Sequence, residues 1–163
     1  MKIAIISDIH DNINNLKKFL KKIKKLKIKE IICCGDIGSP LSLNILSNKK
    51  NIKVHFVFGN IDGDKVAMAE IAFKSRNITL HNEFGELKIK GKKIAFLHNP
   101  KIARLLAKNN EYNAVFYGHT HQSKEEKIGK TLLINPGEIA GFLGNPTFAL
   151  YDLEKNKINI LNF

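Results

Sequence analysis

Apolar residues form short continuous runs in the first third of the chain, and each run ends in a cluster of polar residues. Residues 2–7 and 30–34 are apolar at both odd and even positions, which is typical of strands buried on both faces. Residues 53–58 predict a third strand. Between the first two runs, apolar residues recur at helical spacing up to about residue 27, with Asn12 as the expected N-cap. Strands that alternate with helices in this way predict a parallel sheet.

The rest of the chain predicts more strands than helices. Turn residues at Gly91-Lys92, Gly129-Lys130 and Lys155-Asn156 separate neighbouring apolar segments and indicate hairpins. We therefore expect a mixed α/β protein of two packed sheets with helices outside, and a single domain over residues 1–163. The further predicted helices cover residues 39–46, 64–74 and 100–109, and the further strands 78–80, 84–89, 93–97, 114–117, 126–128, 131–134, 147–152 and 158–161.

Chemistry-bearing residues gather where these strands end. Because ligands of open α/β sheets collect beyond the carboxyl ends of the strands, we expect these residues to share one site. Their carboxylate, imidazole and amide groups suit a pair of Mn, Fe, Zn, Ni or Co ions better than Ca. The motifs are Asp8-Ile9-His10, Gly35-Asp36, Gly59-Asn60-Ile61-Asp62, Leu97-His98-Asn99 and Gly118-His119-Thr120-His121.

Asp36 has a particular place in this set, because its two carboxylate oxygens allow it to bridge two ions. Two metals that share a carboxylate also share a solvent molecule, and they lower its pKa enough to supply hydroxide at neutral pH. They also stabilise the charge that develops on a phosphoryl group. Since no serine or cysteine nucleophile is needed, the motifs predict direct hydrolysis of a phosphate ester.

The ordered set D-x-H, G-D, G-N-x-D, H and G-H-x-H resembles the calcineurin-like metallophosphoesterase superfamily. The length of the chain and the closing Asn135-Pro136-Gly137-Glu138 resemble its small prokaryotic phosphodiesterase branch. The resemblance implies a four-layer α/β/β/α sandwich with a dinuclear site at one edge. It also implies Asp8, His10 and His121 as ligands of one metal, Asn60, His98 and His119 as ligands of the other, and Asp36 as the bridge.

The resemblance implies further roles around these ligands. Asn60 would also lie near the phosphate and, with His98, is a predicted catalytic residue, the nucleophile being the hydroxide between the metals. Asp62 would orient neighbouring ligands without touching a metal. Glu138 is a candidate for a similar supporting role.

Two positions depart from the pattern of the relatives. Ile61 stands where many carry a histidine that is proposed to protonate the leaving group, so we expect poor leaving groups to react slowly. Asn99-Pro100 replaces part of the usual H-G-H, and we expect Asn99 to hydrogen-bond phosphate in place of the missing histidine. We expect an altered substrate preference and an intact metal site.

The net charge of +12 raises the question of a nucleic-acid partner. Much of the excess lies between apolar residues of the predicted helix 13–27, which favours a solvated outer face over a binding surface. Phe142 and Phe148 are expected to pack in the core or at a rim, because no stacking platform interleaved with basic residues surrounds them. His55 and His81 lie outside the motifs and are interpreted as structural.

Cys33 and Cys34 are adjacent, and we expect two buried thiols and no disulfide. No apolar run approaches the roughly 20 residues needed to cross a bilayer, and Asp8 interrupts the first run too early for a signal peptide. A cytoplasmic protein without a membrane partner is therefore expected. The sequence leaves homo-oligomerisation open.

The leading hypothesis is a metal-dependent phosphodiesterase with two divalent ions per chain, Mn or Ni in preference to Fe, Co or Zn. It would act on a small or nucleotide-like phosphodiester. A nuclease or a phosphomonoesterase at the same site is the alternative enzyme. A non-catalytic scaffold that binds protein partners is the alternative of another class, and the retention of all seven ligands disfavours it.

Overall fold

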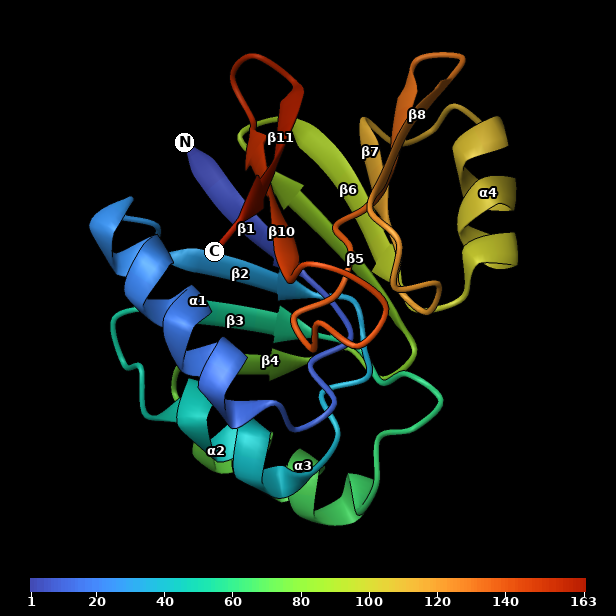
Figure 1. Cartoon of the computed structure of the whole chain (residues 1–163). Coiled ribbons are helices and arrows are strands. Elements are labelled where there is room, and N and C mark those ends of the chain that lie inside the picture. The colour runs from blue at the N-terminus through green and yellow to red at the C-terminus, as the bar shows by residue number, and fades with distance from the viewer.

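A computed structural model describes residues 1–163, and two mixed sheets form its centre (Figure 1). In the six-stranded sheet, the strands in spatial order are β11 (Lys157–Asn162), β10 (Thr147–Asp152), β1 (Lys2–Ile6), β2 (Glu30–Cys33), β3 (Lys53–Phe56) and β4 (Ile78–Leu80). In the five-stranded sheet they are β5 (Phe84–Ile89), β6 (Lys92–Leu97), β7 (Ala114–Phe116), β9 (Thr131–Asn135) and β8 (Lys124–Ile128). The helices are α1 (Ile13–Lys25), α2 (Pro40–Ser47), α3 (Lys65–Lys74) and α4 (Pro100–Lys108).

The central strands of both sheets are parallel. Strands β1 to β4 run parallel in the first sheet, and β6, β7 and β9 run parallel in the second. Antiparallel strands complete the remaining edges, with β10 and β11 beside β1, β5 beside β6, and β8 beside β9. Each sheet therefore offers a row of parallel carboxyl ends, which is the arrangement that collects ligands.

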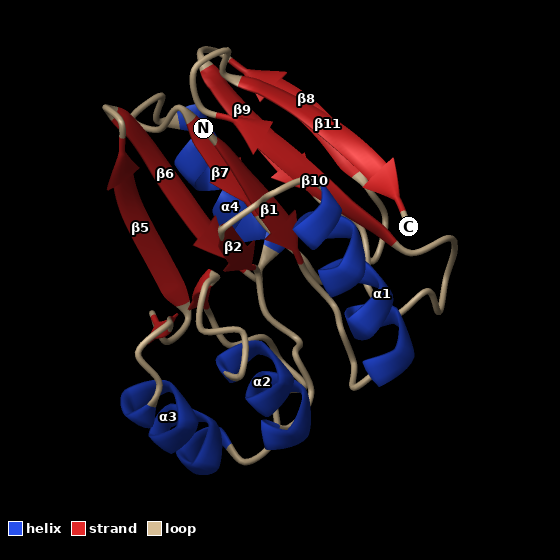
Figure 2. Ribbon diagram, turned by 90° about the vertical axis from the view of Figure 1, so that its left-hand side faces the viewer, coloured by secondary structure: helices blue, strands red, loops and turns tan.

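Three apolar cores separate four layers. Helices α1, α2 and α3 pack on the outer face of the six-stranded sheet. Phe19 of α1 and Phe56 of β3 belong to the core cluster between them. The two sheets pack against each other through a second cluster that contains Phe96 and Tyr151. Helix α4 covers the other sheet through Ala103 and its neighbours. Figure 2 shows α4 on the opposite side of the sheets from α1. The predicted α/β/β/α sandwich is confirmed.

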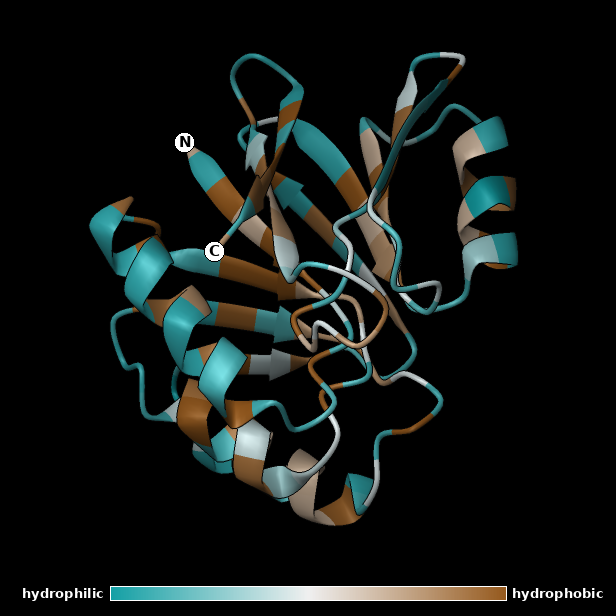
Figure 3. Cartoon of the chain, in the orientation of Figure 1, coloured by the Kyte–Doolittle hydropathy of each residue, from teal (hydrophilic) through white to brown (hydrophobic).

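Burial on both faces explains the continuous apolar pattern of β1. Ala4 and Ile6 face the helices, whereas Ile3 and Ile5 face the second sheet. Helix α1 has only one covered face, and its lysines occupy the other, so polar and apolar bands alternate along it (Figure 3). Asn12 caps it as predicted, because its side chain accepts a hydrogen bond from the Asn15 amide at 3.1 Å.

The predicted elements are all present, and the differences lie at their ends. Strands β1, β2 and β3 end one or two residues early, because the chain leaves the extended conformation to present polar side chains. The predicted turn at Gly91-Lys92 lies one residue earlier, at Lys90-Gly91. Both residues have positive φ, 47° and 75°, as a tight hairpin turn requires. Strand β8 begins at Lys124, two residues before the predicted start.

Two smaller expectations are also confirmed. Cys33 and Cys34 are free and buried, and burial raises the pKa of both thiols. His55 and His81 lie beside each other, with His55 Nδ1 3.1 Å from His81 Nε2, and His55 Nε2 lies 3.5 Å from Glu30. No helix has the length and apolar character needed to span a bilayer.

Candidate metal centre

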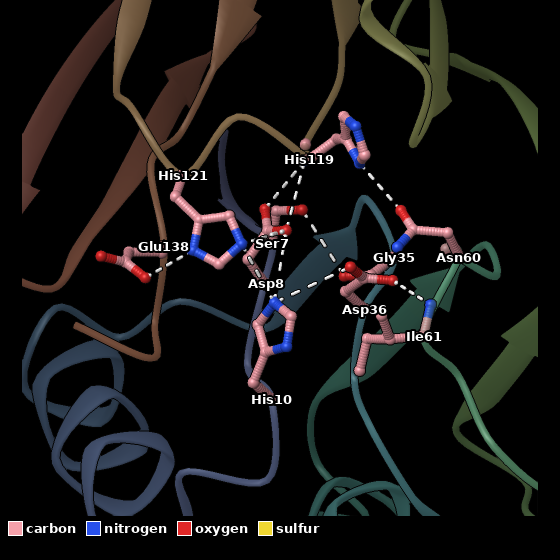
Figure 4. A network of polar contacts seen from close by, with 12 residues as sticks. Ser7, Asp8, His10, Gly35, Asp36, Asn60, Ile61, His119, His121 and Glu138 are labelled. Carbon is pink, nitrogen blue, oxygen red and sulfur yellow. Dashed lines mark hydrogen bonds and ion pairs between the residues drawn. The ribbon is translucent and has the colours of Figure 1, made fainter. Parts of the chain in front are cut away.

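The motifs converge at one end of the sandwich, where the parallel strands of both sheets terminate. Asp8 follows β1, Asp36 follows β2 and Asn60 lies beyond β3, while His98 follows β6 and the segment with His119 and His121 follows β7. Figure 4 shows side chains from both sheets directed toward one another. The structure thus brings all seven predicted ligands together.

The first group of donor atoms comes from Asp8, His10 and His121. His10 Nε2 lies 3.7 Å from Asp8 Oδ1 and 3.1 Å from His121 Nε2. His121 Nε2 lies 3.5 Å from the same carboxylate oxygen. One oxygen and two imidazole nitrogens therefore surround a common point, as a transition-metal site requires.

The second group lies around Asn60. Its Oδ1 is 2.9 Å from His98 Nε2 and 2.8 Å from His119 Nδ1. His98 Nε2 also lies 3.2 Å from Asp36 Oδ2. His119 and His121 are two residues apart but belong to different groups, as predicted from their spacing.

Asp36 lies between the two groups. Its Oδ2 is 3.2 Å from His98 Nε2 and 3.7 Å from His10 Nε2. Its Oδ1 accepts a hydrogen bond from the Ile61 amide at 3.0 Å. The sequence suggested that both oxygens would face the metals, but one is held by the backbone. Oδ2 alone therefore faces both groups of donor atoms.

The donor set fits divalent cations because it is electron-rich and lacks a cationic side chain. Asp8 and Asp36 are buried, and histidines are their only ion-pair partners. Two buried carboxylates without compensation would be costly. His98 Nδ1 bonds the Cys34 carbonyl at 2.8 Å, so in the neutral tautomer Nε2 directs a lone pair toward Asp36 Oδ2 and Asn60 Oδ1. These lone pairs repel one another, and a cation bound among them would offset the repulsion.

In the absence of a metal ion, protonation of the histidines can supply part of the positive charge that the carboxylates attract. Burial lowers the pKa of His98, but the hydrogen bond to Asp36, the negative charges of Asp36 and Asp8 and the bond to the Cys34 carbonyl together outweigh burial and leave that pKa raised. The pKa of Asp36 is correspondingly lowered: burial opposes ionisation, and the bonds from His98 and the Ile61 amide overcome it. The hydrogen bond to Asp8 raises the pKa of His10. The ionised carboxylates thus attract protons when no metal is present.

Backbone strain is concentrated at these residues. Five of them have φ values in the left-handed region, which costs a non-glycine residue about 1 kcal/mol or more. Such strain persists where the surrounding structure imposes it and is common at functional sites. The five are Asp8 (54°), His10 (47°), Asp36 (53°), His119 (75°) and His121 (59°).

Glycines allow the loops to approach closely. A Cβ on Gly118 would overlap the Ser7 hydroxyl and lie 2.9 Å from Asp8 Oδ2. A Cβ on Gly59 would overlap Asp36 Oδ1 and lie 2.6 Å from its amide nitrogen. Any side chain at these two positions would therefore displace the ligands.

Asp62 connects the loops that follow β2 and β3. Its carboxylate accepts hydrogen bonds from the amides of Asp36 at 3.1 Å, Gly38 at 2.9 Å and Gly59 at 2.7 Å. Burial raises the pKa of Asp62, and these amides offset the shift only in part. Asp62 contacts the backbone around Asp36 rather than the metal-facing atoms, which agrees with the expected orienting role.

Glu138 and Asn135 hold the loops of the second sheet. Glu138 Oε2 lies 2.7 Å from His121 Nδ1, which leaves His121 Nε2 free to face the cluster. Glu138 Oε1 accepts from the amides of Leu143 at 2.7 Å and Gly144 at 3.1 Å. Burial raises the pKa of Glu138, but the backbone amides of Phe142 and Leu143 and the bond to His121 together leave it lowered. Asn135 donates to the Gly118 carbonyl at 3.0 Å, so this motif supports the site from behind as predicted.

Asn99 has a structural role that the sequence analysis did not assign to it. Its Oδ1 accepts hydrogen bonds from the amides of Lys101 at 2.9 Å and Ile102 at 3.2 Å, so Asn99 is the N-cap of α4. The Pro100 at the first turn of α4 is the signal that would have identified the cap. The cap uses only Oδ1, and Asn99 is exposed, so its contact with phosphate through the side-chain amide nitrogen stays a prediction.

The sequence did not show that the loop with Phe142 forms the rim next to the cluster. The ring of Phe142 lies 5.5 Å from the ring of His10, yet 62% of Phe142 is exposed. Leu143 and Ile61 are exposed as well. Phe142 was expected to be core or rim, and the structure places it at the rim. Its position depends on the loop geometry set by Glu138, which the hydrophobic pattern does not encode.

This fold and this cluster define a metal-dependent phosphoesterase class of protein. The chain belongs to the calcineurin-like phosphoesterase superfamily, whose domain model matches residues 1–156. It is 31% identical over 162 residues to phosphodiesterase MJ0936 of Methanocaldococcus jannaschii, and the match covers 96% of each chain. The family and this relative support a hydrolase of phosphate esters, and they support the small prokaryotic branch.

Solved structures support the same assignment. A structure described as a novel archaeal phosphodiesterase is 29% identical, covers 100% of both chains and superposes with a TM-score of 0.88. The zinc complex of Vps29 from Entamoeba histolytica is 20% identical, covers 98% of this chain and 90% of its own, and has a TM-score of 0.70. At that identity the second likeness concerns the fold alone.

Proposed function

We propose that this protein is a phosphodiesterase that uses two divalent metal ions per chain to hydrolyse a small, nucleotide-like phosphate diester. The observation that carries the proposal is that seven side chains, Asp36 among them, gather in two adjoining groups of donor atoms with no lysine or arginine paired to them. In this assignment Asp8, His10 and His121 hold one ion, Asn60, His98 and His119 hold the other, and Asp36 contacts both.

Ions bound there would supply a hydroxide nucleophile at neutral pH and stabilise the negative charge on the phosphoryl oxygens. The chain positions the substrate. Asn60 directs Oδ1 toward His98 and His119, so its amide group is left to donate a hydrogen bond to a phosphoryl oxygen. Asn60 is exposed and can reach a substrate. His98 is held by the Cys34 carbonyl and so keeps Nε2 directed at the centre.

The leaving group must depart without help from residue 61. Ile61 is exposed beside the cluster and carries no proton to give, while its amide is bound to Asp36. Esters whose leaving group is a weak base need little protonation. We therefore expect nitrophenyl esters to react much faster than alkyl esters.

Hydrolysis of a chromogenic diester and its monoester analogue by metal-stripped protein, with added Mn, Ni, Fe, Co or Zn, tests the proposal. We expect Mn or Ni to restore diesterase activity and Asp36→Asn to lower it by about 10³-fold or more. Asp64→Asn is the matched control, because Asp64 caps α3 and asparagine caps equally well. Absence of activity with every metal would refute the proposal.

The same assay distinguishes the alternatives. Preference for the monoester would identify a phosphomonoesterase, and preference for RNA or DNA a nuclease. An inactive protein that retains its partners when Asp36 is replaced by asparagine would identify a scaffold.

A further inference from the structure

A groove with lysines on both walls lies at the amino ends of the parallel strands of the six-stranded sheet, at the opposite end from the metal centre. It has a volume of about 800 Å³ and is bounded by α1 with the segment after it, and by the end of α2 with the segment before β3. These segments precede the amino ends of β2 and β3, whereas the metal ligands follow the carboxyl ends. The segments that bound the groove, α1 and the chain before β3, lie on the left of Figure 1, so the groove is separate from the metal centre.

One wall of the groove carries five lysines. Lys17, Lys21 and Lys24 project from α1 at spacings of four and three residues, and Lys27 and Lys29 follow the helix. Like charges at these helical spacings repel each other and destabilise the helix. Nothing within the wall offsets this repulsion, because none of the five forms an ion pair.

The opposite wall has the same sign of charge. It contributes Lys49 and Lys50, also without ion-pair partners, and the groove contains no aspartate or glutamate. Four lysines elsewhere pair with glutamates, as Lys74 does with Glu70 at 3.1 Å and Lys124 with Glu126 at 2.8 Å, whereas all seven lysines of the groove are unpaired. A general excess of lysine would not by itself leave this one concave surface free of carboxylates.

The backbone at Lys27 supports the same conclusion. Lys27 has a φ of 56° directly after the end of α1, a position at which helices favour glycine. A lysine there carries backbone strain that a glycine would not.

The floor of the groove is aliphatic. Ile45 and Ile52 are half-buried, and Leu20 and Ile28 lie beneath the walls. There is no arginine or aromatic residue, which a groove for single-stranded nucleic acid would use for stacking. A concave surface also cannot lie flat on a membrane. An apolar floor between cationic walls is instead complementary to an amphipathic helix with an acidic polar face.

We propose that this groove binds an acidic amphipathic helix of a partner protein. Apolar side chains at helical spacing would cover Ile45 and Ile52, while aspartates and glutamates beside them would pair with the lysines of both walls. The charge pairs would weaken with salt, and the apolar contact would not.

Fluorescence anisotropy with a labelled peptide of about 18 residues, or five helical turns, tests the proposal. The peptide has leucine on one face and glutamate elsewhere, and a scrambled peptide of the same composition is the reference. We expect the amphipathic peptide to bind about tenfold or more tightly than the scrambled one, because only it covers the floor. Equal binding of the two peptides would overturn the proposal.

Two triple variants locate the binding. Lys21→Glu, Lys24→Glu and Lys49→Glu together should weaken peptide binding about tenfold or more. Lys101→Glu, Lys108→Glu and Lys127→Glu change the net charge equally but lie outside the groove on exposed positions, and should have an effect of less than about twofold. Equal effects of the two triples would show attraction by net charge alone and overturn the proposal.

Lys27→Gly provides a second variant whose folding is not at risk. This variant should weaken binding of the peptide, because it removes one charge of the wall. It should also raise the melting temperature by several degrees, since glycine relieves the backbone strain. Single-stranded RNA and anionic vesicles are the competing ligands. If either binds the wild type more tightly than the peptide and loses binding in the groove triple, the groove has a different occupant and the proposal fails.

Discussion

At the scale of single residues, three of the predicted ligands are each held by a second group that fixes the metal-facing atom. Glu138 directs His121, the Cys34 carbonyl directs His98 and the Ile61 amide directs Asp36. Orienting partners of this kind normally contribute substantially to metal affinity. The affinity of the site should therefore depend on residues that touch no metal.

Glu138→Gln tests this dependence. The substitution keeps the size of the side chain but removes the charge that orients His121. We expect metal affinity to fall about 10–100-fold, measured by titration calorimetry with Mn. Glu125→Gln is the matched control, because Glu125 is exposed on β8 and forms no ion pair. Unchanged affinity in Glu138→Gln would contradict the orienting role.

The ligand types and their order were predictable from the sequence, because each stands directly after an apolar run. The side-chain contacts were not. The capping role of Asn99 and the single free oxygen of Asp36 depend on where neighbouring amides lie in space. Sequence spacing along one strand does not report a contact with another strand.

At the scale of elements, the strands were predicted well and the loops poorly. Burial on both faces of β1 and β2 gives an unmistakable apolar pattern, so their existence followed from the sequence. The segment 141–146 has no such pattern. Its place beside His10 comes from the hydrogen bonds of Glu138 with Leu143 and Gly144. This loop is therefore the element from which substrate preference should arise.

Phe142→Ala tests the loop. The exposed ring next to His10 can pack against an aromatic group or a base of the substrate. We expect KM for an aryl or nucleoside diester to rise about 3–10-fold, and KM for a methyl ester to stay unchanged. Phe73→Ala is the control, because Phe73 is 92% exposed on α3. Equal effects on both esters would show that the ring does not contact the substrate.

At the scale of the whole molecule, the free energy of unfolding depends on pH through histidines whose pKa values are shifted in opposite directions. Burial, together with the charge of His55, lowers the pKa of His81 below 6.5. The pKa values of His10 and His98 are raised. In metal-free protein the unfolded chain protonates His81 more readily than the folded chain below about pH 6.5, so His81 makes stability fall as pH falls.

His81→Gln should therefore reduce the loss of stability between about pH 7 and pH 5, since it removes a group that protonates preferentially in the unfolded chain. Urea unfolding of metal-free protein at both pH values measures the difference. His10 and His98 act with the opposite sign in wild type and variant alike, and cancel in the comparison. A steeper loss in the variant would contradict the assignment.

The proposed function depends most directly on the number of ions that the folded chain binds. Metal-stripped protein can be titrated with Mn while bound metal per chain and hydrolysis of a chromogenic diester are measured on the same samples. We predict saturation at about two ions per chain, with activity that rises as the second ion binds. Full activity with one ion, or with none, would contradict a centre in which Asp36 joins two metals.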